Sequence, residues 1–135
     1  RALEMNVKTY EQFLKCGFTD KPTFDENGWL TNNKEMLKTM ETKVIFEEDG
    51  KLLKLYLLEL PNKKWITGIS MMLHDCGTGG YPSVWGKQFD SKEIAIEHNL
   101  TNVIKNMKVR NITSEKKYIA ILKAHIAECR QLSLF

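Results

Sequence analysis

The chain has no long apolar run and no recognisable targeting segment. Its longest apolar stretch, LLKLYLLEL, is interrupted by Lys54 and Glu59 and falls short of the roughly 20 residues that cross a bilayer. Residues 1–16 are mixed with polar side chains and contain no apolar stretch of the kind found in secretory signals. These absences argue against a membrane-spanning class and predict a cytoplasmic protein.

Cysteine is scarce. Cys16, Cys76 and Cys129 are odd in number and widely spaced, and no CxxC pair occurs. Disulfide frameworks and structural zinc sites both depend on grouped cysteines. The three histidines also form no i, i+4 pair: His74, His98 and His125. The sequence therefore predicts reduced thiols and neither a metal site nor a cofactor.

A strong charge bias is also absent, since the formal net charge is only +3. Residues 1–86 hold 11 Lys/Arg against 12 Asp/Glu, whereas residues 87–135 hold 9 against 5. A dedicated DNA-binding domain is usually more basic than this. We expect at most a weak DNA contact through the basic C-terminal section, with aromatic rings stacking on bases and lysines meeting phosphates. The candidates are Trp29, Trp65, Tyr81 and Trp85 for stacking, and Lys87, Lys92, Lys105 and Lys108 for phosphates.

What is present is the composition of an ordinary folded domain. The 135 residues are 42% hydrophobic and 27% charged, which suits a single core. The chain begins at Arg1 and not at methionine, so either Met5 is the native start or the chain is a piece of a larger protein, and we expect the latter. The pattern predicts one α+β domain over residues 1–130, followed by a C-terminal peptide motif over residues 131–135.

Three consecutive segments predict the strands of a meander sheet. Residues 42–48, 51–60 and 64–73 are rich in β-branched, aromatic and leucine residues, and the turn sequences EDGK and PNKK separate them. The middle segment is apolar on both parities, so we expect it to be the central, most buried strand. A fourth strand is expected over residues 83–89. The sheet is thus predicted to be antiparallel with three or four strands.

Periodic apolar positions predict a short N-terminal helix. Residues 5–16 place Tyr10, Phe13 and Leu14 on one face, and Gly17 is a suitable stop. Residues 32–41 predict about two further helical turns, with Asn33 as the cap and with Met36, Leu37 and Met40 facing inward.

Two long helices are expected to pack on the sheet at the C-terminal end. One covers residues 89–107 with Asp90 as its N-cap, and the other covers residues 112–129 with Thr113 or Ser114 as its N-cap. Their buried stripes are expected to be Ile96, Leu100, Val103, Ile104 and Met107, and then Tyr118, Leu122, Ile126 and Cys129.

The glycine-rich segment over residues 74–86 is a candidate ligand loop. Glycines allow close backbone approach to a phosphate, although the order of a P-loop is missing. His74 and Cys76 share a side of an extended chain and are a conceivable base and nucleophile, but Asp75 between them points away. The alternative is a simple connection between strands, with Tyr81 and Trp85 folded onto the core. The candidate residues are His74, Cys76, Gly77, Gly79 and Gly80.

The chain ends on Gln131, Leu132, Ser133, Leu134 and Phe135. This pentapeptide resembles, at all five positions, the motif with which bacterial replication and repair proteins bind the sliding clamp. The resemblance implies that Leu134 and Phe135 enter an apolar pocket, that Leu132 adds a second apolar contact, and that Gln131 fixes the register by hydrogen bonds. The alternative is that the last helix continues and that Leu132 and Phe135 pack on the core.

A second, looser resemblance covers residues 60–100. The hairpin LPNKKW, the glycine-rich segment and FDSKEIAI resemble a segment of bacterial phage and mobile-element proteins, which accompanies DNA methyltransferases and ParB-like proteins. Lys63 stands where that hairpin has glycine. No methyltransferase motif occurs in the 135 residues, so any such activity is expected in a parent or partner chain.

Together these features predict a non-catalytic accessory domain of a phage or mobile-element protein. It would be linked to DNA modification or replication and would dock on the sliding clamp through residues 131–135. Two alternatives stay open. One is a small enzyme or ligand-binding protein that uses residues 74–86, and the other is self-association through the sheet or the terminal helices.

Overall fold

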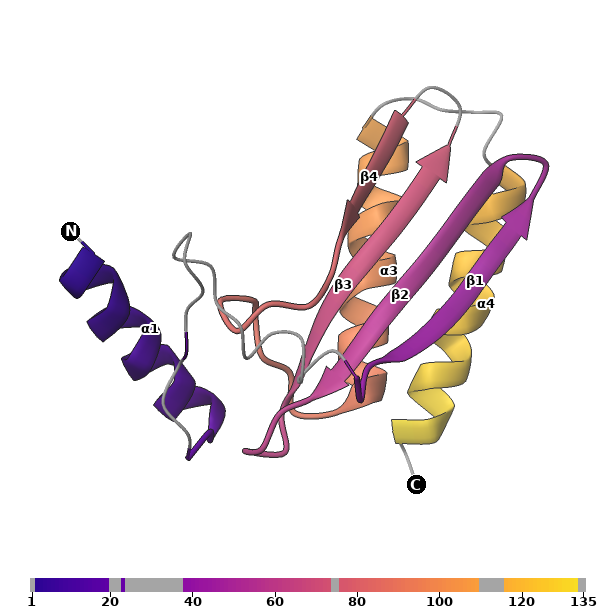
Figure 1. Cartoon of the computed structure of the whole chain (residues 1–135). Helices are drawn as coiled ribbons and strands as arrows, with labels where there is room; N and C mark the ends of the chain where they lie inside the picture. Colours follow the sequence, from indigo (N-terminus) through magenta and orange to yellow (C-terminus); the bar gives the residue numbers. More distant parts are fainter. Residues whose placement is uncertain (1, 20–22, 24–37, 74–75, 110–115, 134–135) are drawn as a thin grey trace.

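The computed structural model describes residues 2–19, 23, 38–73, 76–109 and 116–133. It confirms the α+β class: a four-stranded antiparallel sheet carries two long C-terminal helices on one face, and a helix lies at the N-terminal end (Figure 1). The strands follow one another in chain order, β1-β2-β3-β4, which is the predicted meander.

Three of the strands lie where the sequence predicts them. They are β1 (Glu41–Glu48), β2 (Lys51–Glu59) and β3 (Trp65–Leu73). Asp49 and Gly50 join β1 to β2 with φ values of 49° and 75°. Two-residue hairpin turns favour positive φ, since this backbone conformation matches the twist of the two strands. Strand β2 lies inside the sheet, and its leucines Leu53, Leu55 and Leu57 are fully buried.

The fourth strand lies elsewhere than predicted. It is β4 (Cys76–Gly80), within the glycine-rich segment, and it pairs with β3 in a continuous register from Leu73↔Cys76 to Ile69↔Gly80. The expected strand over residues 83–89 makes only an isolated bridge between Phe89 and Trp65. Glycine disfavours strands, but a short hairpin connection places the chain beside β3, and this pairing outweighs the weak local propensity.

The helices α3 (Lys92–Val109) and α4 (Lys116–Ser133) lie behind the sheet in Figure 1 and form the main core with it. Both predicted stripes are confirmed, since every side chain named for them is buried. The N-cap of α3 is a correction: Ser91 and not Asp90 caps it, because the Ser91 Oγ accepts a hydrogen bond from the amide of Ile94 at 3.2 Å. The cap expected at Thr113 or Ser114 lies outside the described residues.

Helix α1 (Ala2–Cys16) ends at Gly17, whose φ is +90°. It forms a second, smaller core in which Phe13 and Cys16 meet Leu58 and Ile66 of the sheet. The predicted face is only partly correct, because Phe13 is buried whereas Tyr10 and Leu14 are 38% and 55% exposed. The two turns predicted over residues 32–41 fall largely outside the described residues.

Candidate functional site

The C-terminal peptide begins inside helix α4. The helix runs to Ser133, so Gln131 and Leu132 occupy its last turn, and Leu134 and Phe135 lie outside the described residues. Gln131 is exposed and Leu132 is 55% exposed. The last buried side chain of α4 is Cys129. Helical continuation through Ser133 agrees with one alternative, while Leu132 is more than half exposed and Phe135 lies outside the described residues.

The end of α4 is fastened to α3 just before this peptide. The Arg130 Nε donates a hydrogen bond to the Glu97 Oε1 at 2.8 Å. Both side chains are partly exposed, so the pair adds at most about 1 kcal/mol to stability. The position of this pair matters more than its strength. It links α4 to α3 at Arg130, and residues 131–133 of α4 follow directly after it.

Part of the glycine-rich segment over residues 74–86 forms strand β4. Cys76, Gly77, Gly79 and Gly80 all belong to β4 and pair with β3, so their backbone follows a ladder and does not curl around an anion. His74 lies outside the described residues, and the structure gives no geometry for a His74 and Cys76 pair.

The aromatic residues that follow β4 are exposed. Tyr81 and Trp85 are 63% and 58% exposed, so the expectation that they fold onto the core is wrong. The ring of Tyr81 meets the ring of Tyr56 of β2 at a tilt of 44°, with centroids 5.0 Å apart, so Tyr81 rests on the sheet surface without being buried.

Of the residues expected to contact DNA, the structure brings Trp65 and Lys92 together, with the Lys92 Nζ 5.8 Å from the centroid of the Trp65 ring. Trp65 is partly buried against the main core, and Trp29 lies outside the described residues. Lys87 lies over the ring of Phe89, with its Nζ 5.5 Å from the centroid, and Lys92 is paired with Glu41. Of the predicted lysines, Lys105 is exposed, and nothing is described of the Lys108 side chain.

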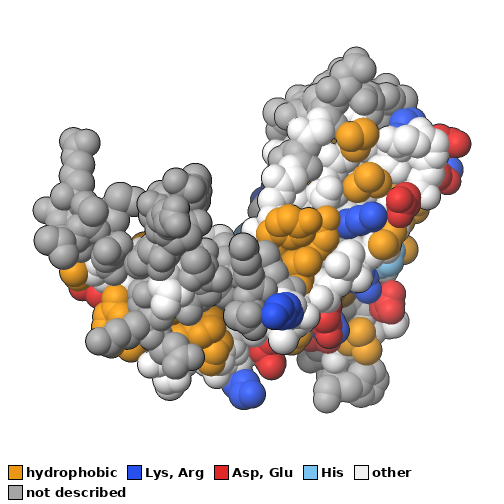
Figure 2. Space-filling model, in the orientation of Figure 1, with side chains coloured by type: hydrophobic (Ala, Val, Ile, Leu, Met, Phe, Trp, Pro, Cys, Tyr) orange, Lys and Arg blue, Asp and Glu red, His pale blue; other side chains and the backbone are white. Residues whose placement is uncertain are grey.

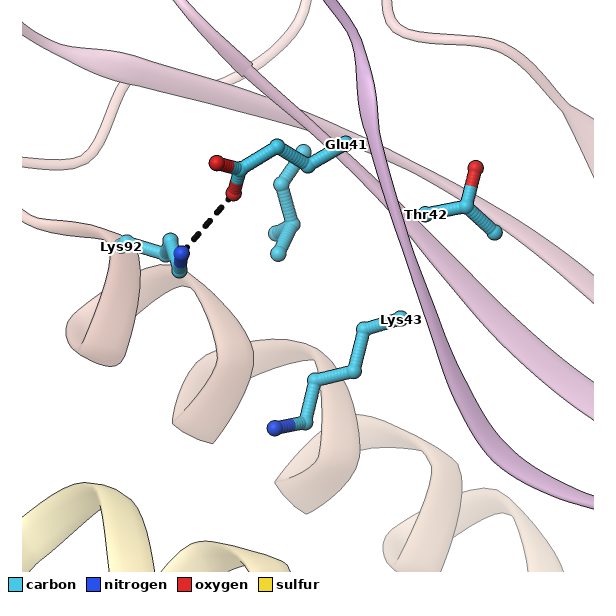
Figure 3. A pocket seen from close by; sticks show the side chains of 5 residues that line it. Glu41, Thr42, Lys43 and Lys92 are labelled. Atoms are coloured by element: carbon cyan, nitrogen blue, oxygen red, sulfur yellow. Dashed lines mark hydrogen bonds and ion pairs between the residues drawn. The ribbon is translucent and has the colours of Figure 1, made fainter.

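A polar hollow of about 480 Å³ opens beside the start of β1 (Figure 3). The Lys92 Nζ meets the Glu41 Oε2 at 2.8 Å, while Lys43 extends from β1 toward the helix layer. Thr42 and Leu57 complete its lining. The hollow is shallow, so it lacks the enclosure of a catalytic centre. Glu41, its one carboxylate, is paired with Lys92 and is not placed to act as a general base.

A second hollow of about 490 Å³ runs between α3 and α4. Three of its lining residues carry positive charge, namely Lys105, Lys123 and Arg130, and its remaining lining is Thr101, Ile104, Ile126 and Ala127. The sequence indicated the basic character of this section but missed Lys123 as a groove residue. Its place could have been found from the helical pattern, because Lys123 follows the buried Leu122 and precedes the buried Ile126 on the edge of the apolar stripe.

The titratable groups inside the fold are not activated for chemistry. Burial raises the pKa of the Cys16 thiol, and burial also raises the pKa of the Cys129 thiol, which makes both poor nucleophiles. Burial, with a smaller contribution from the cation of Lys43, lowers the pKa of His125. Across the described residues, no three His, Cys, Asp or Glu side chains are grouped to hold a metal ion, and no helix is long and apolar enough to span a membrane.

Comparisons of the chain with protein-family models, with curated proteins and with solved structures gave no significant match.

Proposed function

We propose that this chain is a non-catalytic interaction domain that docks on the bacterial sliding clamp through residues 131–135. The observation that carries the proposal is the exposure of Leu132, which stands 55% exposed three residues beyond Cys129, the last buried side chain of α4. More than half of this leucine's surface is open to solvent. Its side chain is free to meet a partner, as the resemblance of the pentapeptide implies.

The helical state of Gln131 and Leu132 is compatible with docking. The last four carbonyl groups of a helix have no partner within it, and its final turn frays readily. Releasing this turn breaks no core contact of Gln131 or Leu132, because both side chains are exposed. The tail then extends at a small cost, and Leu134 and Phe135 enter the apolar pocket of the clamp as the anchor.

The groove between α3 and α4 supports an accessory role on DNA. Lys105, Lys123 and Arg130 line it, and Arg130 directly precedes the tail. A domain held by that tail has Lys105 and Lys123 close to its point of attachment, where they can meet phosphates weakly, whereas Arg130 is paired with Glu97. This fits the setting implied by residues 60–100, a phage or mobile-element protein linked to DNA modification or replication.

The test is direct binding of the full chain to a purified bacterial sliding clamp, followed by surface plasmon resonance. Removal of residues 131–135, and the double substitution Leu134→Ala with Phe135→Ala, are both expected to abolish binding. The matched control is Glu128→Gln, an exposed change on the same helix outside the groove, which is expected to leave clamp binding intact. Thermal unfolding of all variants is expected to match that of the unmodified chain.

Two results would overturn this proposal. One is clamp binding that survives loss of Leu134 and Phe135. The other is a large drop in melting temperature on removing residues 131–135, because the tail would then belong to the core. We do not propose the alternative of an enzyme built on residues 74–86, because the glycines of that segment pair in β4.

A further inference from the structure

Lys43 carries a positive charge that no described residue neutralises. Its side chain extends from β1 toward the helix layer and lines the polar hollow together with Glu41 and Lys92 (Figure 3). Lys43 is half-buried, and it makes neither an ion pair nor a hydrogen bond with the described part of the chain. A cation that is partly withdrawn from water is costly unless an anion pairs with it. The ammonium group of Lys43 therefore points to an anion that enters the hollow from solvent.

The second cation of the hollow is held at its rim by two contacts. The Lys92 Nζ donates a hydrogen bond to the Glu41 Oε2 at 2.8 Å and lies 5.8 Å from the centroid of the Trp65 ring. Lys92 and Glu41 thus balance each other. With Lys43 added, the lining residues carry two positive charges and one negative charge, so a ligand with one negative charge makes the site neutral.

The charge of Lys43 acts on two side chains of α4. It adds to the effect of burial in lowering the pKa of His125, and it opposes the effect of burial in raising the pKa of the Cys129 thiol. The Nδ1 of His125 is buried and has no hydrogen-bond partner among the described residues. An anion paired with Lys43 changes the electrostatic surroundings of His125, so the imidazole ring reports on the site.

The charges around the hollow favour a ligand with a single negative charge. Several carboxylates of α3 and α4 act on Cys129 through space, namely Glu93, Glu97 and Glu128. They repel the excess charge of a dianion. Figure 2 shows positive and negative side chains interspersed on the sheet face away from α3 and α4, so the cations of the hollow do not continue there into a broad positive surface of the kind that binds nucleic acid.

We propose that the polar hollow is a binding site for a small organic monocarboxylate, whose carboxylate group pairs with the ammonium group of Lys43. Leu57 in the lining gives the carbon chain of the ligand an apolar contact. The volume of about 480 Å³ is within the range of small-molecule sites. Because the hollow is shallow, the ligand enters and leaves without a movement of the fold. No described residue of the C-terminal peptide lines the hollow, so this binding is separate from docking on the clamp.

The test follows the imidazole signals of His125 by NMR during pH titrations of the full chain, with acetate and butyrate as probes. Each probe is expected to raise the pKa of His125 and to saturate, because a bound carboxylate offsets the cation of Lys43. Sodium chloride at equal ionic strength is expected to give no saturating change, which separates binding from screening. Sodium sulfate, a dianion throughout the titration, is expected to bind more weakly than acetate.

Three lysine variants assign the binding to Lys43. Lys43→Met is expected to weaken acetate binding about tenfold or more, because a charge-assisted hydrogen bond is lost, and to raise the pKa of His125 without any probe. Lys43→Arg keeps the charge and is expected to keep binding. Lys123→Met is the matched control, because Lys123 is exposed on α4 and is not among the residues that line the hollow. Circular dichroism checks that all three variants fold.

Lys92→Met provides a second test that leaves Lys43 in place. It frees the carboxylate of Glu41 to repel the probe or to pair with Lys43, so acetate binding is expected to weaken. Three results overturn the proposal: acetate that acts no differently from chloride, acetate binding that survives Lys43→Met, and sulfate that binds more tightly than acetate.

Discussion

Gly68 of β3 lies directly against Gly80 of β4. A β-carbon on Gly68 would overlap the carbonyl oxygen of Gly80 and would stand 2.8 Å from the Pro82 nitrogen. The chain that leaves β4 therefore crosses over Gly68, and Tyr81 can reach Tyr56 only because position 68 has no side chain. The sheet contains glycines of two kinds, one required by the fold and others that are not, such as Gly79, where a β-carbon would meet nothing closer than 3.8 Å.

Substitution of Gly68 and of Gly79 is expected to change the free energy of unfolding differently. Gly68→Ala should lower the free energy of unfolding by about 3 kcal/mol, the upper end of the usual cost of overpacking, because the atoms it meets belong to backbone. Gly79→Ala is its matched control, which should leave stability unchanged or raise it by roughly 0.5–1 kcal/mol. Urea unfolding followed by circular dichroism measures both. Equal effects at the two positions would contradict this account of the β4 crossing.

Two leucines on α4 should differ strongly in their contribution to stability. Leu122 is completely buried between α4 and the sheet, whereas Leu132 is 55% exposed. Leu122→Ala is expected to lower the free energy of unfolding by about 2–5 kcal/mol, and Leu132→Ala to change it by no more than about 0.5 kcal/mol. Chemical denaturation of the two variants makes the comparison within one helix. A large loss from Leu132→Ala would mean that the tail stabilises the fold.

His125 should make stability depend on pH. Its pKa in the folded chain is lowered, first by burial and then by the cation of Lys43, against a smaller opposite effect of Glu128. The Nδ1 of His125 is buried and has no hydrogen-bond partner among the described residues. As the pH falls below about 6.5, the unfolded chain binds the proton more readily than the folded chain does, so the free energy of unfolding decreases.

The measurement is urea unfolding between pH 7.5 and pH 5. Replacement by His125→Gln should remove this part of the pH dependence, because the substituted side chain does not titrate and the other groups are unchanged. Lys43→Met should reduce it without removing it, since burial is the larger cause. An identical pH dependence in the unmodified chain and in His125→Gln would contradict the assignment.

Much of the fold could be predicted because its elements carry strong periodic signals. The stripe from Ile96 to Met107 and the one from Tyr118 to Cys129 are regular, and all their named side chains are buried. The turn at Asp49 and Gly50 has the chemistry that a two-residue hairpin requires. In these segments local preference and tertiary packing agree, so sequence reasoning succeeds.

The errors occur where a tertiary contact opposes or selects among local preferences. Glycines in β4 predict a loop, but pairing with β3 makes a strand. Asp90 and Ser91 are both good caps, and only the path of the chain after the Phe89 bridge decides that Ser91 accepts the bond from Ile94. Tyr10 and Leu14 look like core residues by type, yet α1 turns a different side toward the sheet.

The sequence by itself determined the α+β class, the order of the strands and the inward sides of α3 and α4, because periodicity reports which residues a helix or strand must bury. It also determined the pentapeptide at the C-terminus. Only the tertiary structure decided which apolar residues stay uncovered. Burial depends on what packs opposite a side chain, and no local pattern records that the sheet covers Phe13 while Leu14, Met72 and Leu132 remain exposed.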